Sequence, residues 1–179
     1  MKVINVHSRI VDQPKSELAA LFKTLASRDD KMLATDKWPP MKLDNGLSLG
    51  SKGGHGPIRY FVTAYRPGEF IRFQFTKPNG FDGVHEFEII ERAPRETEIK
   101  HIISMNLSGA ALLKWPLAIR WLHDAFIEDA FDKVENHFSQ LKKTTSWNIW
   151  VRILRGLLRP FGKRNHSYGN SVPKWKSEN

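Results

Sequence analysis

The sequence WPLAIRWLHDAFIEDAFDKVENHFSQLK, residues 115–142, decides the fold. At about 100° per residue its apolar side chains fall on one broad stripe, so we predict a single long helix with Pro116 near its start. The stripe consists of Ile119, His123, Phe126, Ile127, Ala130, Phe131, Val134, Phe138 and Leu141. A second face is acidic and is formed by Asp124, Glu128, Asp132 and Glu135. We interpret it as a solvated face, helped by Arg120 four residues before Asp124.

The chain before this helix is typical of strands separated by turns. The turn signals are Pro67-Gly68, Pro78-Asn79-Gly80 and Ala93-Pro94. They separate runs of alternating or β-branched and aromatic residues at 58–65, 70–76, 84–90 and 97–105. Because no helix long enough for a parallel crossover lies between these runs, an antiparallel sheet is favoured.

The N-terminal segment supplies one more strand and a short helix. Residues 2–11 alternate in the manner of a half-buried strand, with Ile4, Val6, Ser8 and Ile10 against Asn5, His7 and Arg9. Residues 15–27 have helical spacing after Pro14, and residues 29–40 are a short helix or loop. This order predicts an α+β fold in which a curved antiparallel sheet wraps around the long C-terminal helix.

Composition restricts the chemistry and the compartment. The 179 residues are 40% hydrophobic and include no cysteine, which excludes disulfides, thiolate zinc sites, iron–sulfur clusters and a cysteine nucleophile. The N-terminus lacks the pattern of a signal peptide, and no run of about 18 apolar residues occurs. A cytoplasmic protein is therefore expected.

The positive charge is concentrated at the C-terminus. Residues 1–141 contain 19 basic and 18 acidic side chains, whereas residues 142–179 contain 9 basic side chains and one acidic one. We therefore divide the chain into a nearly neutral domain, 1–143, and a basic amphipathic tail, 144–179, which we expect to be partly flexible.

Several segments resemble the helix-grip fold of the START, Bet v 1 and polyketide cyclase (SRPBCC) superfamily, most closely bacterial members with no settled chemistry. They are Trp38-Pro39-Pro40, GSKGGHGPIRY at 50–60, YRPG at 65–68, GVHEF at 83–87 and LHDAFIED at 122–129. The likeness covers about residues 1–141. It implies a deep, mostly apolar cavity between sheet and helix that holds a lipid, a polyketide-like molecule or another hydrophobic molecule. The superfamily has no single catalytic motif, so the resemblance implies no particular reaction.

Three histidines lie on apolar faces of the expected elements: His85, His101 and His123. In a cavity wall, a neutral imidazole can hydrogen-bond a ligand or transfer a proton near pH 7. The alternative is that each is a partly buried core residue bonded to a backbone carbonyl. The three are therefore candidate catalytic residues, with none assigned. The predicted ligand-binding residues are Trp38, Tyr60, Phe73, Phe75, His85, Phe87, His101, Ile103, Met105, His123, Phe126 and Ile127.

Metal and cofactor sites are not predicted. No His-x-x-x-His spacing occurs, and the predicted long helix contains no Glu-x-x-His spacing. The glycine-rich stretch Gly50–Gly56 lacks a Gly-Lys-Ser/Thr ending and precedes a strand, so it favours a hairpin or bulge over a phosphate site. Lys52 and His55 are candidates for a pocket rim.

The tail has the pattern of an interfacial helix. Arg152, Arg155 and Arg159 share one face, and an arc rich in tryptophan and leucine that includes Trp147 and Trp150 lies opposite. These five residues are predicted to dock on a membrane surface; the alternative is packing on the domain or on a partner protein. Nucleic acid is ranked last, because single-strand binding needs the aromatic and basic residues interleaved.

The sequence thus predicts storage or transfer of a lipid or other hydrophobic small molecule in an internal cavity, with the tail docked on a membrane or partner. An enzyme resembling a polyketide cyclase or dehydratase, which uses a cavity histidine, is the first alternative. A protein-interaction scaffold is the second. We rank binding above catalysis.

Overall fold

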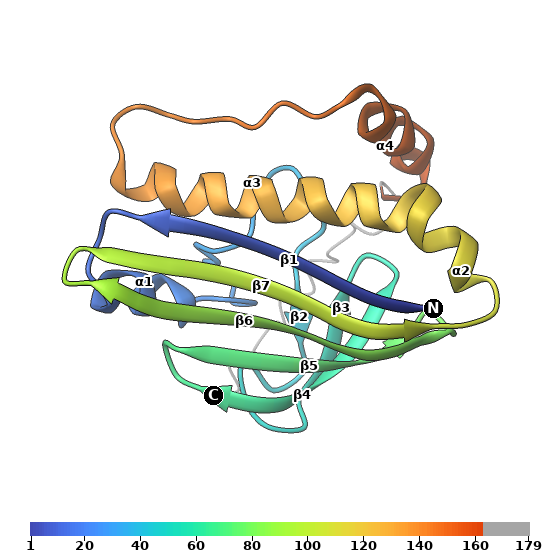
Figure 1. Ribbon diagram of the computed structural model, residues 1–179, viewed down its shortest axis with the longest axis horizontal. Coiled ribbons are helices and arrows are strands. Elements are labelled where there is room, and N and C mark those ends of the chain that lie inside the picture. Colours follow the sequence, from blue (N-terminus) through green and yellow to red (C-terminus); the bar gives the residue numbers. More distant parts are fainter. Residues whose placement is uncertain (163–179) are drawn as a thin grey trace, which may run out of the picture.

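The computed structural model describes residues 1–162 and has the predicted helix-grip architecture (Figure 1). Its sheet has seven antiparallel strands in the order β1-β7-β6-β5-β4-β3-β2. The strands are β1 (Lys2–Val11), β2 (Lys42–Leu43), β3 (Lys52–His55), β4 (Ile58–Arg66), β5 (Phe70–Lys77), β6 (Phe81–Ala93) and β7 (Glu96–Leu107). The strands around 58–65, 70–76, 84–90 and 97–105 are thereby confirmed.

The helices lie at the two ends of the chain. They are α1 (Lys15–Phe22), α2 (Ala111–Lys114), the π-helical turn η1 (Trp115–Ile119), α3 (Arg120–Phe138) and α4 (Ile149–Gly162). The predicted long helix corresponds to η1 and α3, with α2 directly before it, and it ends at Phe138. Leu141, placed on its buried stripe by the sequence, is exposed because it follows the helix.

The core fills the space between the concave face of the sheet and α3. Phe126, Ile127, Phe131 and Val134 are buried, as the helical stripe predicts. They pack on inward residues of β4 to β7 and on α1. Residues 139–148 return along α3, so that α4 lies beside the start of the helix (Figure 1).

The glycine-rich segment is a hairpin, as predicted. A Cβ atom at Gly53 would overlap the carbonyl oxygen of Lys42 on β2, and one at Gly54 would overlap the carbonyl oxygen of Ile58 on β4. Glycine is therefore required where β3 runs between its two neighbours.

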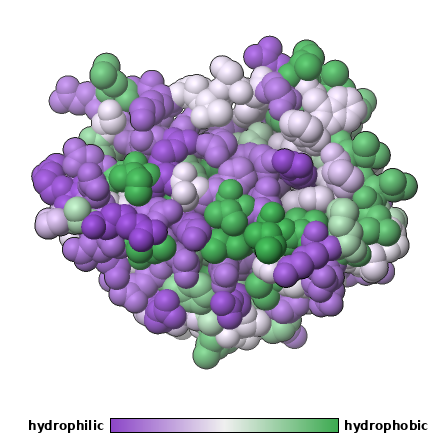
Figure 2. Space-filling model, in the orientation of Figure 1, coloured by the Kyte–Doolittle hydropathy of each residue, from purple (hydrophilic) through white to green (hydrophobic). Residues whose placement is uncertain are grey.

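Strand β1 is confirmed, but its faces are the reverse of those expected from its hydrophobic pattern. Ile4, Val6 and Ile10 are exposed, and hydrophobic side chains gather over β1 on the surface shown in Figure 2. His7 and Arg9 turn inward instead, because they pair across the strands with buried residues of β7. Directly paired residues share one face of an antiparallel sheet, so β7 decides which side of β1 is buried.

Candidate functional site

A cavity of about 340 Å³ lies between the sheet and the start of α3. Its walls come from β3 to β7, the loop that contains Trp38, η1 and α3, and its lining is almost entirely apolar. Eight of the predicted ligand-binding residues line it: Trp38, Phe75, His85, Phe87, His101, Ile103, His123 and Phe126. The other four lie outside its lining, in the packed core: Tyr60, Phe73, Met105 and Ile127.

Several lining residues were not on the predicted list. Met41, Phe81, Trp115 and Leu158 belong to segments whose place over the cavity is set by the tertiary fold. His55 was expected only at a rim, and its ring stacks on Phe126 with 4.9 Å between ring centroids. No local pattern signals the other four positions.

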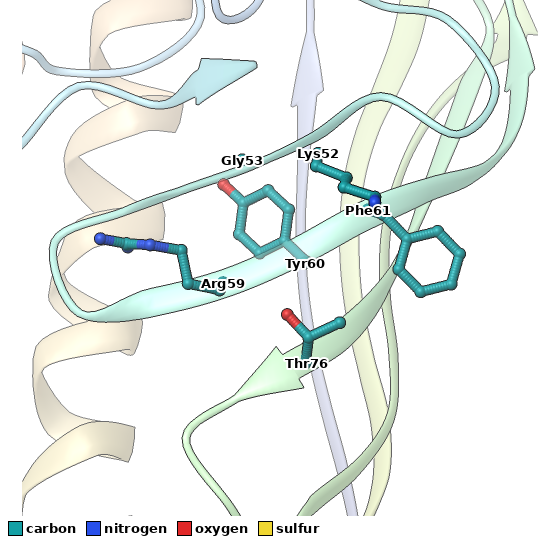
Figure 3. A pocket seen from close by; sticks show the side chains of 6 residues that line it. All are labelled: Lys52, Gly53, Arg59, Tyr60, Phe61 and Thr76. Atoms are coloured by element: carbon teal, nitrogen blue, oxygen red, sulfur yellow. The ribbon is translucent and has the colours of Figure 1, made fainter. Parts of the chain in front are cut away.

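Other hollows are less suited to hold a ligand. A groove of about 310 Å³ crosses β3, β4 and β5, but its side chains point in different directions along the strands (Figure 3). A second groove, of about 440 Å³, is lined mainly by charged and polar residues between Lys31 and Thr144. The cavity under α3 is therefore the candidate site.

The structure brings the three candidate histidines together. The ring centroids of His85 and His101 are 5.6 Å apart, and those of His101 and His123 are 5.0 Å apart. Nε2 of His101 is 3.4 Å from Nδ1 of His85. Nδ1 of His123 is 3.3 Å from Oδ1 of Asp124.

Each of these histidines has one ring nitrogen that is buried and has no hydrogen-bond partner among residues 1–162. These atoms are His85 Nε2, His101 Nδ1 and His123 Nε2. The backbone-bonded core histidine, which was the alternative expectation, therefore does not describe them. Leaving a buried polar group without a hydrogen bond lowers stability by about 1–3 kcal/mol. Polar partners for these three nitrogens would therefore be stabilising.

Burial keeps this part of the site neutral at pH 7. It lowers the pKa of His85 and His101 well below 6.5, and the charges of neighbouring histidines lower it further. Burial also lowers the pKa of His123, although Asp124 opposes the shift. The pKa of His55 is lowered to about 4, again mainly by burial.

Asp124 joins the cavity to a charged cluster on β1. Its Oδ1 accepts hydrogen bonds from Asn5 Nδ2 at 3.0 Å and from His7 Nε2 at 3.1 Å, besides the contact with His123. Burial opposes its ionisation, but these hydrogen bonds outweigh burial and hold the pKa of Asp124 well below its usual range. An ionised carboxylate only accepts, so Nδ1 of His123 donates and its Nε2 carries the lone pair.

His7 lies between two carboxylates of α3. Its two ring nitrogens contact Glu128 at 2.9 Å and Asp124 at 3.1 Å. Burial lowers the pKa of His7, but the bonds to the two carboxylates outweigh burial and raise the pKa above 6.5.

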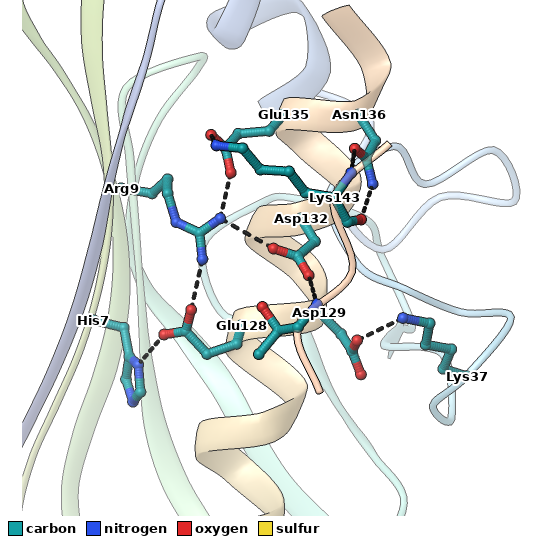
Figure 4. Close-up of polar contacts among 10 residues, drawn as sticks. His7, Arg9, Lys37, Glu128, Asp129, Asp132, Glu135, Asn136 and Lys143 are labelled. Carbon is teal, nitrogen blue, oxygen red and sulfur yellow. Dashed lines mark hydrogen bonds and ion pairs between the residues drawn. The ribbon is translucent and has the colours of Figure 1, made fainter. Parts of the chain in front are cut away.

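The acidic face of α3 is turned toward β1, which corrects its interpretation as a solvated face. Arg9 contacts Glu128 at 2.6 Å, Asp132 at 3.0 Å and also Glu135 (Figure 4). The expected Arg120–Asp124 pair does form, at 3.5 Å, on the outer side. Helical spacing alone identified one face as acidic but could not show that a basic strand covers it.

Within the part of the chain that the structure describes, one group has metal-ligand geometry: His7, His123 and Asp124, with ligand atoms within 4.8 Å of one another. These atoms already form hydrogen bonds with each other. The cluster is explained by those bonds, and we assign no metal to it.

The tail packs against the domain near the cavity. Nε1 of Trp147 donates to Asp129 Oδ2 at 2.8 Å, and Nε1 of Trp38 donates to the same oxygen at 2.8 Å. The Arg155 guanidinium lies 4.1 Å from the centroids of both tryptophan rings. Leu158 reaches the lining of the cavity. Trp147 and Arg155, two of the predicted docking residues, are thus engaged by the protein's own domain.

The other predicted docking residues differ in position. Arg152 is exposed, and Trp150 is partly exposed while its Nε1 donates to the carbonyl oxygen of Leu117 at 2.8 Å. The Arg159 side chain and residues 163–179 lie outside what the structure describes. None of the helices within residues 1–162 combines the length and apolar character needed to cross a bilayer.

No family model and no curated protein matches the chain. Solved structures do share its fold. Norcoclaurine synthase from Thalictrum flavum, in complex with dopamine and hydroxybenzaldehyde, is 10% identical with a TM-score of 0.59, over 80% of this chain and 90% of that one. Ara h 8.0201 is 12% identical with a TM-score of 0.57, over 76% and 97%. A protein of Nitrosospira multiformis is 16% identical with a TM-score of 0.57, over 78% and 97%. At such identities the likeness supports the Bet v 1-like helix-grip fold and nothing finer.

Proposed function

We propose that the protein stores or transfers a lipid or another hydrophobic small molecule, bound in the cavity under α3. The observation that carries the proposal is an apolar cavity whose wall contains three buried histidine nitrogens without partners. Small-molecule sites typically combine apolar walls with a few polar groups in about 300–1,000 Å³. At about 340 Å³ the cavity suits one compact molecule. The fold shared with norcoclaurine synthase, whose solved complex contains two small aromatic molecules, supports the same proposal.

Filling the cavity tests this proposal. Ile103 lines the cavity, whereas its neighbour Ile102 lies on the opposite face of β7. Protein purified without detergent is analysed by native mass spectrometry and by solvent extraction, and binding is measured with a panel of hydrophobic compounds. We expect Ile103→Trp to lose the bound compounds and Ile102→Trp to keep them. Equal binding by both variants, or no binding by the unaltered protein, would contradict the proposal.

We further propose that the same end of the molecule docks on an anionic membrane. Eight large apolar side chains are exposed on α2, η1 and α4: Leu112, Leu113, Leu117, Ile149, Trp150, Ile153, Leu157 and Leu158. They lie near Lys114, Arg120 and Arg152, which are also exposed, and four more basic residues follow in the tail beyond residue 162. An apolar surface bordered by positive charge favours a bilayer that contains anionic lipids.

Vesicle flotation separates this docking surface from a protein-binding one. We expect co-flotation with phosphatidylglycerol vesicles and little with phosphatidylcholine vesicles. The double variant Leu117→Asp/Leu157→Asp should abolish it, and Leu49→Asp, at an exposed leucine on a different loop, should not. Flotation unaffected by the double variant, with loss of a co-purifying protein instead, would favour the scaffold.

The Asp124–His123 pair favours catalysis as a second candidate function. A neutral histidine held by an ionised carboxylate, with its free nitrogen on an apolar wall, has the arrangement of a general base. A probe is 5-nitrobenzisoxazole: a base removes its carbon-bound proton, the ring N–O bond breaks, and the oxygen retains the electron pair as a coloured phenolate. His123→Gln should abolish any acceleration, and His137→Gln, an exposed histidine on the same helix, should retain it. Equal rates for the two variants would leave binding as the function.

A further inference from the structure

The cavity wall itself indicates the polar group of its ligand, on the premise that the cavity binds a small molecule as proposed above. His85 and His101 share one hydrogen bond, between His101 Nε2 and His85 Nδ1 at 3.4 Å. Both rings are buried among aromatic residues: His85 stacks on Phe73 and Phe75, and His101 packs edge-on against Phe87. No carboxylate lines the cavity among the described residues, so both rings are neutral and each carries one proton.

A neutral pair joined in this way always presents one donor and one acceptor. If His101 Nε2 donates, Nδ1 of His101 has a lone pair and Nε2 of His85 has the proton. If His85 Nδ1 donates, the two free nitrogens exchange these roles. In both tautomers the remaining nitrogens, His101 Nδ1 and His85 Nε2, need one hydrogen-bond donor and one acceptor from elsewhere.

His123 adds a second acceptor with a fixed tautomer. Its Nδ1 proton is directed at Asp124, so the unpartnered Nε2 offers a lone pair. The three rings of the wall therefore offer two hydrogen-bond acceptors and one donor. The ring centroids of His123 and His101 are 5.0 Å apart, and those of His101 and His85 are 5.6 Å apart.

These requirements discriminate among polar groups. A hydroxyl group donates one hydrogen bond and also accepts, so it can satisfy a lone pair and the donor. A carboxylate only accepts, and two of the three nitrogens would oppose it with lone pairs. An ammonium group only donates, and the wall supplies no negative charge to replace its hydration.

We infer that the ligand is an uncharged, apolar molecule with at least one hydroxyl group, phenolic or alcoholic, held against His85, His101 and His123. A free fatty acid or a primary amine is disfavoured by the same wall.

Three probes with one aromatic frame test the inference: 2-naphthol, naphthalene and 2-naphthoate. Binding to the full chain is measured by fluorescence titration at pH 7.5. We expect naphthol to bind about tenfold more tightly than naphthalene, which corresponds to about 1.4 kcal/mol for the hydrogen bonds gained. Naphthoate should bind more weakly than naphthalene, because two of the three nitrogens oppose its charge with lone pairs and Lys114, the basic residue of the lining, is exposed to water.

Two histidine variants test whether the cavity wall causes the preference for naphthol over naphthalene. In His123→Phe the advantage of naphthol over naphthalene should fall several-fold, while naphthalene still binds and so reports a folded cavity. His137→Phe, the exposed control, should preserve the tenfold ratio. Binding of all three probes with equal affinity, or tightest binding of naphthoate, would overturn the hydroxyl assignment and leave cavity binding intact. Failure of all three to bind would instead contradict the proposed binding function, and the assignment with it.

Discussion

The interface between α3 and the sheet has two unlike halves. Toward the end of α3, Arg9 of β1 binds three carboxylates of the helix, so the polar atoms there find partners within the chain. Toward its start, the interface opens into the cavity, and three histidine nitrogens have no partner among residues 1–162. Asp124 stands at the boundary, because it contacts His7 on one side and His123 on the other.

This contrast shows how one helix can be both anchored and functional. Charged side chains that satisfy one another fix α3 against β1 at one end, so the other end does not need tight packing to hold the helix. Open space and unsatisfied groups destabilise a fold, and natural proteins tolerate them mainly at functional sites. The cavity end is therefore the end to which we assign ligand binding.

Acid should affect the cavity end most strongly. The pKa values of His55, His85, His101 and His123 are lowered by burial, so the unfolded chain takes up a proton at each of them near pH 6.5 and the folded chain does not. Stability should therefore fall as pH falls from 6.5 toward about 4, the pKa of His55. The limiting slope is about 1.4 kcal/mol per pH unit for each histidine. His7 has the opposite sign: its raised pKa contributes stability at low pH, and that contribution is lost as pH rises through its folded value.

Urea denaturation at several pH values measures this slope. The double variant His85→Phe/His101→Phe should flatten it between pH 6.5 and 4, whereas the exposed-site variant His137→Phe should not. An unchanged slope in the double variant would mean that these rings are not buried in their neutral form.

At the charged end, Arg9→Met should destabilise the protein by about 3 kcal/mol, because Arg9 is the cation that contacts all three carboxylates and the only one that reaches Asp132 among the described residues. His7 still contacts Glu128 and Lys143 still contacts Glu135 in this variant. Arg95→Met is the control, since the Arg95–Asp12 pair is exposed and contributes at most about 1 kcal/mol. Denaturation midpoints at pH 7 give both values. If the two variants lose equal stability, the charged end does not anchor α3.

Asp129 holds the loop with Trp38 and the tail against the domain beside the cavity. It is buried and accepts hydrogen bonds from Lys37, Trp38 and Trp147. Trp147→Phe removes one bond to a buried charge and should cost about 1.5–3 kcal/mol. The loss should appear in hydrogen exchange as weaker protection of residues 149–158, with the protection of β6 and β7 unchanged. Protection that stays equal in all three segments would show that α4 docks independently of Trp147.

The sequence predicted the sheet and helix well because their patterns are local. Turn signals such as Pro67-Gly68 separate alternating runs, and the stripe through Phe126 and Val134 has the period of a helix. Local patterns also placed His85, His101 and His123 on apolar faces, and the structure brings those faces together.

What the sequence could not predict depends on contacts between distant segments. The inward turn of His7 and Arg9 is decided by β7 and by the acids of α3, since hydrophobicity alone places Ile4 and Val6 inside. In the sequence, Asp129 looks like any other acidic residue of a helix. Its three hydrogen-bond donors come from two distant loops and are seen only in the fold.

The prediction with the smallest expected effect tests which face of β1 is buried. It makes the same valine-to-threonine substitution at two positions of the strand. Val6 is 51% exposed and Val11 is 4% exposed on the same strand. Val6→Thr should change the free energy of unfolding by no more than about 0.5 kcal/mol, because its hydroxyl remains in water. Val11→Thr should cost about 1–3 kcal/mol, because there the hydroxyl is buried. The reverse ranking would mean that the hydrophobic face of β1 is the buried one, and Arg9 could then no longer reach the carboxylates of α3.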